Sequence, residues 1–117
     1  MLTMHFLGPG DDAEDELRID PPHQNVISFI SAEINHDVDR AQAWIADLRK
    51  ALRGDRVASM GNVFDVEADA KMAKLTNEFV GPPDLVIEVP TPWLLDAIER
   101  WHAYLVSRGF KPHELAD

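Results

Sequence analysis

Two segments with helical spacing of their apolar residues most constrain what this chain can fold into. In segment 37–54, DVDRAQAWIADLRKALRG, and in segment 91–109, apolar residues recur at three- and four-residue steps. Such spacing gathers apolar side chains on one face of an α-helix, which must then be buried against another part of the chain. The predicted buried faces consist of Val38, Ala41, Trp44, Ile45, Leu48 and Leu52, and of Leu94, Ala97, Ile98, Trp101, Tyr104 and Leu105.

Both segments have boundary residues typical of helices. Asn35 or Asp37 is the predicted N-cap of the first helix, and Thr91 is the predicted N-cap of the second. Gly54 and Gly109 follow the two helices, at positions where glycine adopts a left-handed conformation without steric cost. The sequence therefore predicts two amphipathic helices with defined ends.

The other ordered segments indicate β-strands. Segment 25–34, NVISFISAEI, is interpreted as a strand because it is rich in β-branched and aromatic residues. The remaining predicted strands are 2–7, a short edge strand at 16–20, a meander over 56–79 with turns near 61–62 and 68–70, and 84–89. The predicted fold class is α+β, with a mainly antiparallel sheet of about five to seven strands and two amphipathic helices packed on one face.

Length and composition favour a single domain over residues 1–117, with 1–24 partly loop and 110–117 a loose tail. The absence of cysteine excludes disulfides and thiolate metal sites. No apolar run is long enough for a membrane helix, and the N-terminus lacks the basic region of a signal peptide. We expect a cytoplasmic protein without membrane association.

The charge balance restricts the classes of partner. The chain has 21 acidic and 11 basic residues, a formal net charge of −10. This charge argues against direct binding to nucleic acid, because phosphate contacts require lysine and arginine, and against anionic membranes. It is compatible with a cationic protein partner, whose association it would accelerate. The alternative is that the acidity only maintains solubility.

The most acidic stretch is GDDAEDELRID, residues 10–20. A calcium loop of the EF-hand type, counted from Asp11, would require glycine at the sixth position and glutamate at the twelfth. These positions hold Glu16 and Pro22, so no metal site is predicted. We expect a mobile, solvated loop that attracts a cationic partner at long range through Asp11, Asp12, Glu14, Asp15 and Glu16.

A second acidic pattern lies in VFDVEAD, residues 63–69, where Asp65, Glu67 and Asp69 alternate with apolar residues. In a strand, alternate side chains share one face at intervals of about 6.6 Å. Such a row of like charges is unfavourable unless it has a partner. The partner is either Lys71 and Lys74 on the next strand or a second protein, and the sequence leaves both interpretations open.

Catalytic signatures are absent from the sequence: it has no phosphate-binding glycine loop and no nucleophile elbow. We predict no enzyme activity, no catalytic residue and no cofactor. Trp93, near the edge of the second helical face, is interpreted either as a binding hot spot or as packing at the start of the helix.

In its size, acidity, α+β pattern and lack of a catalytic motif, the chain resembles bacterial immunity proteins, in particular the CdiI type from contact-dependent growth inhibition. The resemblance implies a cytoplasmic protein that binds a cognate cationic toxin domain, a nuclease in many such systems, and occludes its active site. Residues 35–107, which include KALRGDRV, VFDVEADAKMAKLTNEF and the closing helix, are also similar to small uncharacterised bacterial proteins of the YacL type. No functional residue is carried over by position.

The leading hypothesis is therefore a toxin-neutralising immunity protein. One alternative is an acidic scaffold or oligomerisation module, and another is a small enzyme that uses His36, Asp37 and Asp39. The predicted partner-binding residues are Asp65, Glu67, Asp69, Asp11, Asp12, Glu14, Asp15, Glu16 and Trp93.

Overall fold

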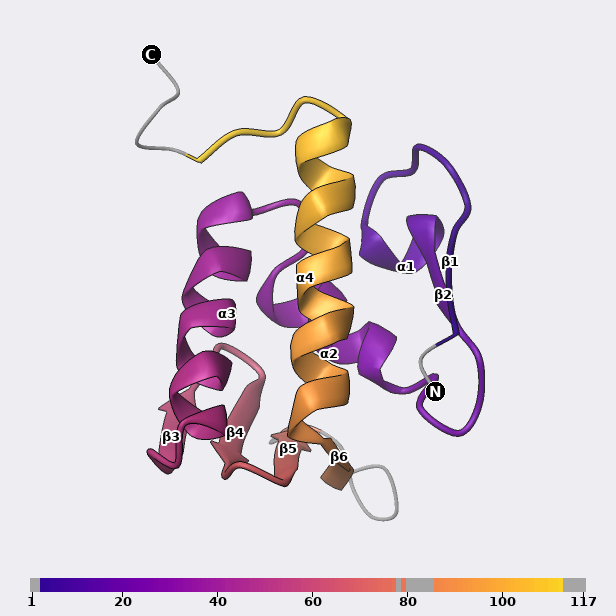
Figure 1. The fold of residues 1–117 in the computed structure, drawn as a ribbon. Helices are drawn as coiled ribbons and strands as arrows, with labels where there is room; N and C mark the ends of the chain where they lie inside the picture. The colour runs from indigo at the N-terminus through magenta and orange to yellow at the C-terminus, as the bar shows by residue number, and fades with distance from the viewer. Residues whose placement is uncertain (1–2, 78, 80–85, 113–117) are drawn as a thin grey trace.

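The computed structural model describes residues 3–77, 79 and 86–112 (Figure 1). The described elements are β1 (Met4–Phe6), α1 (Ala13–Glu16), β2 (Leu17–Ile19), α2 (Val26–Glu33), α3 (Val38–Leu52), β3 (Val57–Met60), β4 (Phe64–Ala68), β5 (Met72–Asn77), β6 (Val86–Pro90) and α4 (Thr91–Ser107). The strands form a two-stranded sheet, β1-β2, and a four-stranded sheet in the order β3-β4-β5-β6. Every pair of neighbouring strands is antiparallel.

The predicted α+β class is confirmed, although the arrangement differs from the predicted one. The described strands number six, within the predicted range, but they divide between two sheets. Four helices are described rather than two. Figure 1 shows α3 and α4 side by side, with the four-stranded sheet at the end where α3 finishes and α4 begins.

The strand predicted over 25–34 is wrong, because this segment forms helix α2. Of its buried apolar residues, Phe29 and Ile30 lie three and four residues after Val26, and Ile34 lies four residues after Ile30. That spacing is helical, whereas neither set of alternate residues in the segment is consistently apolar. Burial of one helical face therefore outweighs the β propensity of the individual residues.

Helices α3 and α4 confirm the two amphipathic predictions. The side chain of Asp37 caps α3 by accepting a hydrogen bond from the Arg40 amide, 3.2 Å away. Thr91 does not cap α4, because the helix already includes it and its N-cap is Pro90. The Thr91 hydroxyl instead donates to the Asp69 carbonyl oxygen at 2.7 Å and so joins α4 to the sheet.

The core lies where α2, α3 and α4 meet the inner face of the four-stranded sheet. Phe29 of α2 stands edge-on to Trp44 of α3 and to Phe64 of β4, with ring centroids 5.3 Å and 5.5 Å apart. Trp44 and Trp101 are both buried, as their positions in the helical faces predict. These aromatic contacts join α2, α3 and the four-stranded sheet.

The predicted meander is present as β3, β4 and β5, with connections at 61–63 and 69–71. The edge strand predicted at 16–20 corresponds to β2, and the strand predicted at 2–7 corresponds to β1, with residue 2 outside the described residues. The predicted strand at 84–89 is β6, and residues 84 and 85 lie outside the described part. The predicted loose tail begins with Phe110, which packs against the core, and residues 113–117 are not among those described.

Among the described residues, no helix combines the length and apolar character needed to cross a membrane.

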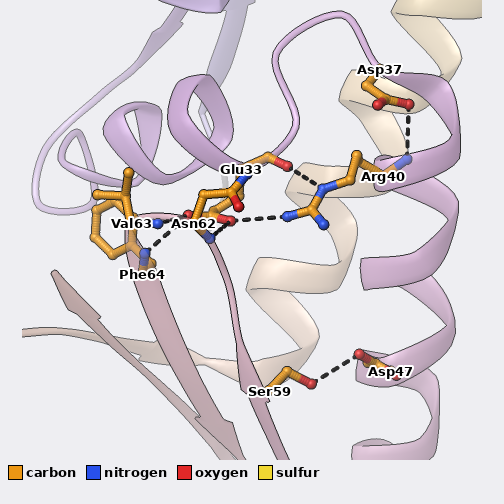
Figure 2. A network of polar contacts seen from close by, with 8 residues as sticks. All are labelled: Glu33, Asp37, Arg40, Asp47, Ser59, Asn62, Val63 and Phe64. Atoms are coloured by element: carbon orange, nitrogen blue, oxygen red, sulfur yellow. Dashed lines mark hydrogen bonds and ion pairs between the residues drawn. The ribbon is translucent and has the colours of Figure 1, made fainter. Parts of the chain in front are cut away.

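A buried carboxylate, that of Glu33, connects α2 to the β3–β4 hairpin and to α3 (Figure 2). Its side chain is 0% exposed and accepts hydrogen bonds from the backbone amides of Asn62, Val63 and Phe64, at 2.8, 2.6 and 2.9 Å. The guanidinium of Arg40 donates to the Glu33 carboxylate at 3.0 Å and to the Glu33 carbonyl oxygen at 2.9 Å. One carboxylate thus accepts hydrogen bonds from three consecutive backbone amides where β3 connects to β4.

Gly61 allows this approach of Glu33 to the hairpin. A β-carbon at position 61 would lie 2.7 Å from the Phe64 carbonyl oxygen, and closer still to the Glu33 carboxylate. Real β-carbon atoms essentially never come so close to a backbone oxygen. The glycine is therefore required by the contact with Glu33.

We predict that Glu33→Ala lowers the free energy of unfolding by about 3–5 kcal/mol, because it leaves the hairpin amides and Arg40 without their charged partner. Glu33→Gln, which keeps one acceptor oxygen, should cost about 1–3 kcal/mol. Denaturant unfolding measures both, with Glu14→Gln on the exposed surface of α1 as the control. A loss for Glu33→Ala no larger than that of the control would contradict this role.

We predict that Gly61→Ala costs about 1–3 kcal/mol of stability, as overpacking of a filled site does. The neighbouring change Asn62→Ala removes an exposed side chain and keeps the amide that bonds to Glu33, so it should change stability by less than about 0.5 kcal/mol. Thermal unfolding of the two variants, measured side by side, tests the comparison. Equal losses would show that position 61 is not sterically restricted.

Candidate functional site

The candidate site is the outer face of the four-stranded sheet, the side opposite the core. Along β4, Phe64, Val66 and Ala68 are buried, Asp65 is half-buried and Glu67 is exposed. The predicted alternation is thus confirmed for Asp65 and Glu67. We define the outer face by the side chains that share their side of the sheet, which are Ala58, Met60, Asp65, Glu67, Met72, Lys74, Thr76, Val86 and Glu88.

Strand register orders the charged residues of this face into one row. Ala58 of β3 pairs with Glu67 of β4, which pairs with Lys74 of β5, which pairs with Glu88 of β6. Neighbouring strands lie about 4.8 Å apart, so the lysine stands between two carboxylates. Of the two lysines considered from the sequence, Lys74 is the cross-strand neighbour of Glu67, whereas Lys71 lies in the connection before β5. This part of the face balances much of its own charge.

The adjacent row of the outer face contains one carboxylate, that of Asp65, and no cation. Met60, Asp65, Thr76 and Val86 occupy neighbouring positions on successive strands. Met60 is 88% exposed, and Val86 is also exposed. Within the described residues, the Asp65 carboxylate has neither a hydrogen bond nor an ion pair. An unpaired carboxylate beside exposed apolar side chains has the composition of a protein-binding surface.

Asp69, the third residue of the predicted row, has a different role. It follows the end of β4, and its carboxylate accepts hydrogen bonds from the amides of Met72 and Lys71, at 2.9 and 2.8 Å. These bonds, that from Met72 foremost, lower the pKa of Asp69 below its ordinary value of 3.8. Asp69 therefore shapes the turn between β4 and β5 rather than extending the row.

A shallow depression of about 240 Å³ lies beside that turn. Its lining combines Arg56 and Lys74 with the carboxylates of Glu67, Asp69 and Glu88. Because cations and carboxylates both line it, it offers no concentrated field for a single small ion.

The acidic stretch at 10–20 is not a solvated loop, and this prediction is corrected. It contains helix α1, whose N-cap Asp12 accepts a hydrogen bond from the Asp15 amide at 3.2 Å. The Ala13 amide donates to the side chain of Asn35 at 2.8 Å, and Ala13 is buried. Asp11, Glu14 and Asp15 remain exposed, whereas Asp12 is half-buried in its capping role.

Glu16 is removed from the predicted partner-binding surface because its side chain is 0% exposed. Its carboxylate pairs with Arg108 and His36 and accepts a hydrogen bond from the Gly10 amide at 3.1 Å. The His36 ring also stacks on Phe110, with ring centroids 4.8 Å apart. This cluster attaches the N-terminal elements to the end of α4.

The enzyme alternative requires His36, Asp37 and Asp39 to act in one site, and the contacts of His36 and Asp37 lead in different directions. His36 is directed to Glu16, while the carboxylate of Asp37 caps α3 through the Arg40 amide. Asp39 lies in the first turn of α3. Among the described residues, no group of three histidine, cysteine, aspartate or glutamate side chains is arranged to hold a metal ion.

The two acidic segments lie at opposite ends of α4. Thr91, at its start, contacts the turn after β4 through Asp69, and Arg108, just past its end, contacts Glu16. With 17 residues, α4 is about 25 Å long. The acidic stretch therefore does not lie beside the Asp65–Glu67 row (Figure 1).

Trp93 packs at the start of α4. Its side chain is half-buried against the core, and its ring stands edge-on to His23 with centroids 4.6 Å apart. These contacts favour the packing interpretation of this residue over the hot-spot interpretation.

A groove of about 320 Å³ between α3 and α4 is a further concave feature. Arg49 and Glu99 form an ion pair across it at 2.7 Å, and Gln42 lies 3.5 Å from His102. The polar groups of its walls are thus directed to one another.

Sequence reasoning missed Met60 and Val86 as members of the site. Both follow the same alternation that identifies Asp65, but their exposure depends on which face of β3 and β6 meets the core. The choice of face is decided by strand register, which was not assigned from the sequence.

Comparison with models of known protein families, with curated proteins and with solved structures found no match for this chain.

We predict that Asp69→Asn destabilises the protein near neutral pH and that this difference shrinks in acid. Because its folded-state pKa is lowered, ionised Asp69 stabilises the fold above about pH 4, and this contribution is lost as the pH falls through the lowered pKa. Denaturant unfolding of wild type and variant at several pH values measures the difference. Asp55→Asn, at an exposed position, is the control, and a pH-independent difference for Asp69→Asn would contradict the prediction.

Proposed function

We propose that this protein acts by binding a cationic partner protein through the outer face of its four-stranded sheet, without chemistry of its own. Of the partner classes considered, a toxin domain of the nuclease type fits the charge best, which makes the protein an immunity protein. The observation that carries the proposal is the Asp65 carboxylate, unpaired among the described residues, beside the exposed Met60 on the face of the sheet opposite the core.

The chemistry of a nuclease site supports this choice of partner. Such a site binds phosphate with arginine and lysine side chains, which also form strong, charge-assisted hydrogen bonds with carboxylates. Asp65 and Glu67 lie on one strand, about 6.6 Å apart. Because the strand backbone fixes their spacing, the two carboxylates are already positioned to accept hydrogen bonds from a basic site.

Within this pair, Asp65 is the stronger candidate for a direct contact. Glu67 has the cation Lys74 directly across the strand pair, and that cation reduces its attraction for a partner. The cross-strand neighbours of Asp65 are Met60 and Thr76, which are uncharged. The exposed thioether of Met60 can add apolar contact area around the ion pair.

The exposed residues of the N-terminal stretch, Asp11, Glu14 and Asp15, contribute differently. They lie at the other end of α4, too far away to share a contact surface with Asp65. Together with the net charge of −10 they contribute to the long-range field, which accelerates association and is weakened by salt. The proposal thus assigns affinity to the sheet and association rate to the overall charge.

We predict that Asp65→Lys with Glu67→Lys weakens binding about a hundredfold, mainly through faster dissociation, because contacts within the interface are reversed. The partner is obtained by capture on the wild-type protein and native mass measurement, starting with any basic domain encoded beside this chain. Binding kinetics are then measured at several salt concentrations.

The matched control is Asp11→Lys with Glu14→Lys, which makes the same change in net charge at the far end of α4. We expect it to slow association less than about tenfold and to lose its effect at high salt. Equal effects of the two double variants would show that the outer face is not the interface. A stable homo-oligomer that captures no partner would favour the scaffold alternative.

A further inference from the structure

Strand β3 forms an edge of the four-stranded sheet. In the order β3-β4-β5-β6, β4 is its only hydrogen-bonded neighbour among the described strands. An edge strand presents a row of unpaired backbone groups, which can accept another strand.

Hydrogen bonding at the hairpin identifies the outward groups. The Gly61 amide donates to the Phe64 carbonyl oxygen at 2.8 Å, and in antiparallel pairs the bonded positions alternate along the strand. The backbone groups of Val57 and Ser59 therefore face β4. Those of Ala58 and Met60 face the free edge, and both residues are exposed.

Within the four residues of β3, this edge has none of three devices that oppose strand addition. Proteins commonly block edges with proline, a charged residue or a bulge. The sequence of β3 is VASM, and each of its residues pairs with β4 in continuous register. Val57–Met60 therefore form a regular, uncharged edge, which follows directly after the exposed Arg56.

The side chains of the outer face next to this edge indicate which residues an added strand would need. On the outer face, Ala58 lies between the edge and Glu67, and Met60 lies between the edge and Asp65. An added strand would stand about 9.6 Å from β4, two strand spacings. Extended arginine and glutamate side chains together span that distance, and the short side chain of Ala58 leaves the path open.

We propose that β3 binds an extended segment of the cationic partner as a fifth strand, with arginine or lysine side chains crossing Ala58 and Met60 to reach Glu67 and Asp65. The inference rests on the proposed function and adds the mode of recognition: backbone hydrogen bonds give affinity, and alternate cationic side chains give specificity.

A second copy of this chain fits the same edge poorly. Each copy has a net charge of −10, so two copies repel. Self-pairing of β3 would also bring only uncharged residues opposite one another, since the strand consists of valine, alanine, serine and methionine. The carboxylates of β4 would remain without cations, so charge complementarity selects a different, basic strand.

The sharpest variant is Ala58→Pro. Proline removes the amide that faces the free edge and is tolerated at such positions of edge strands, so the sheet itself keeps its hydrogen bonds. Ala58→Ser, which retains the amide, is the matched control. Thermal unfolding of both variants checks that the fold persists.

The probe is a capped peptide of alternating arginine and valine, studied by nuclear magnetic resonance of the labelled protein. We expect it to slow hydrogen exchange at the Ala58 and Met60 amides, and to bind Ala58→Pro at least about tenfold more weakly than Ala58→Ser. N-methylation at alternate residues removes the peptide amides that would pair with β3. The methylated peptide should therefore bind wild type as weakly as the unmodified peptide binds Ala58→Pro.

Three results would overturn strand addition, and they separate it from the proposed function. If Asp65→Lys with Glu67→Lys weakens binding while Ala58→Pro does not, or while the edge amides show no protection, the outer face binds basic partners without adding a strand. If neither change matters, both proposals fail. If sedimentation shows a dimer that Ala58→Pro dissociates, a second copy occupies the edge.

Discussion

The structure depends most on the buried carboxylate of Glu33. Three consecutive backbone amides, from Asn62 to Phe64, and the guanidinium of Arg40 donate hydrogen bonds to it, and the side chain of Glu33 is fully buried. A buried charge is tolerated only when its partners replace the lost water. The same requirement fixes α2, α3 and the hairpin relative to one another, because each provides part of the coordination (Figure 2).

The proposed binding surface depends on that arrangement. The hairpin that Glu33 holds has Met60 at the end of one strand and Asp65 near the start of the next, and both face away from the core. Fixing the connection therefore fixes their separation before any partner arrives. A surface that is ordered in advance loses less conformational entropy on binding, which suits an inhibitor that must act without catalysis.

Helices α3 and α4 and the alternation along β4 could be predicted from the sequence, because they follow from local periodicity. The β propensity of residues 25–34 favours a strand in place of helix α2, whereas the spacing of Val26, Phe29 and Ile30 indicates a helix. Glu33 and Glu16 were not predicted to be buried, since their partners lie many residues away in the chain. Asp65 was identified, but its lack of a cationic neighbour depends on strand register, which the sequence pattern alone did not provide.

The most direct test is residue-resolved hydrogen exchange of the unmodified protein. If Glu33 fixes the hairpin, the amides of Asn62, Val63 and Phe64 should exchange nearly as slowly as core amides such as that of Leu75, although two of the three lie in a connection between strands. The amide of Ala70, in the opposite turn, should exchange faster. Exchange of Asn62 and Val63 as fast as that of Ala70 would contradict the account, because the surface around Met60 and Asp65 would then not be held in advance.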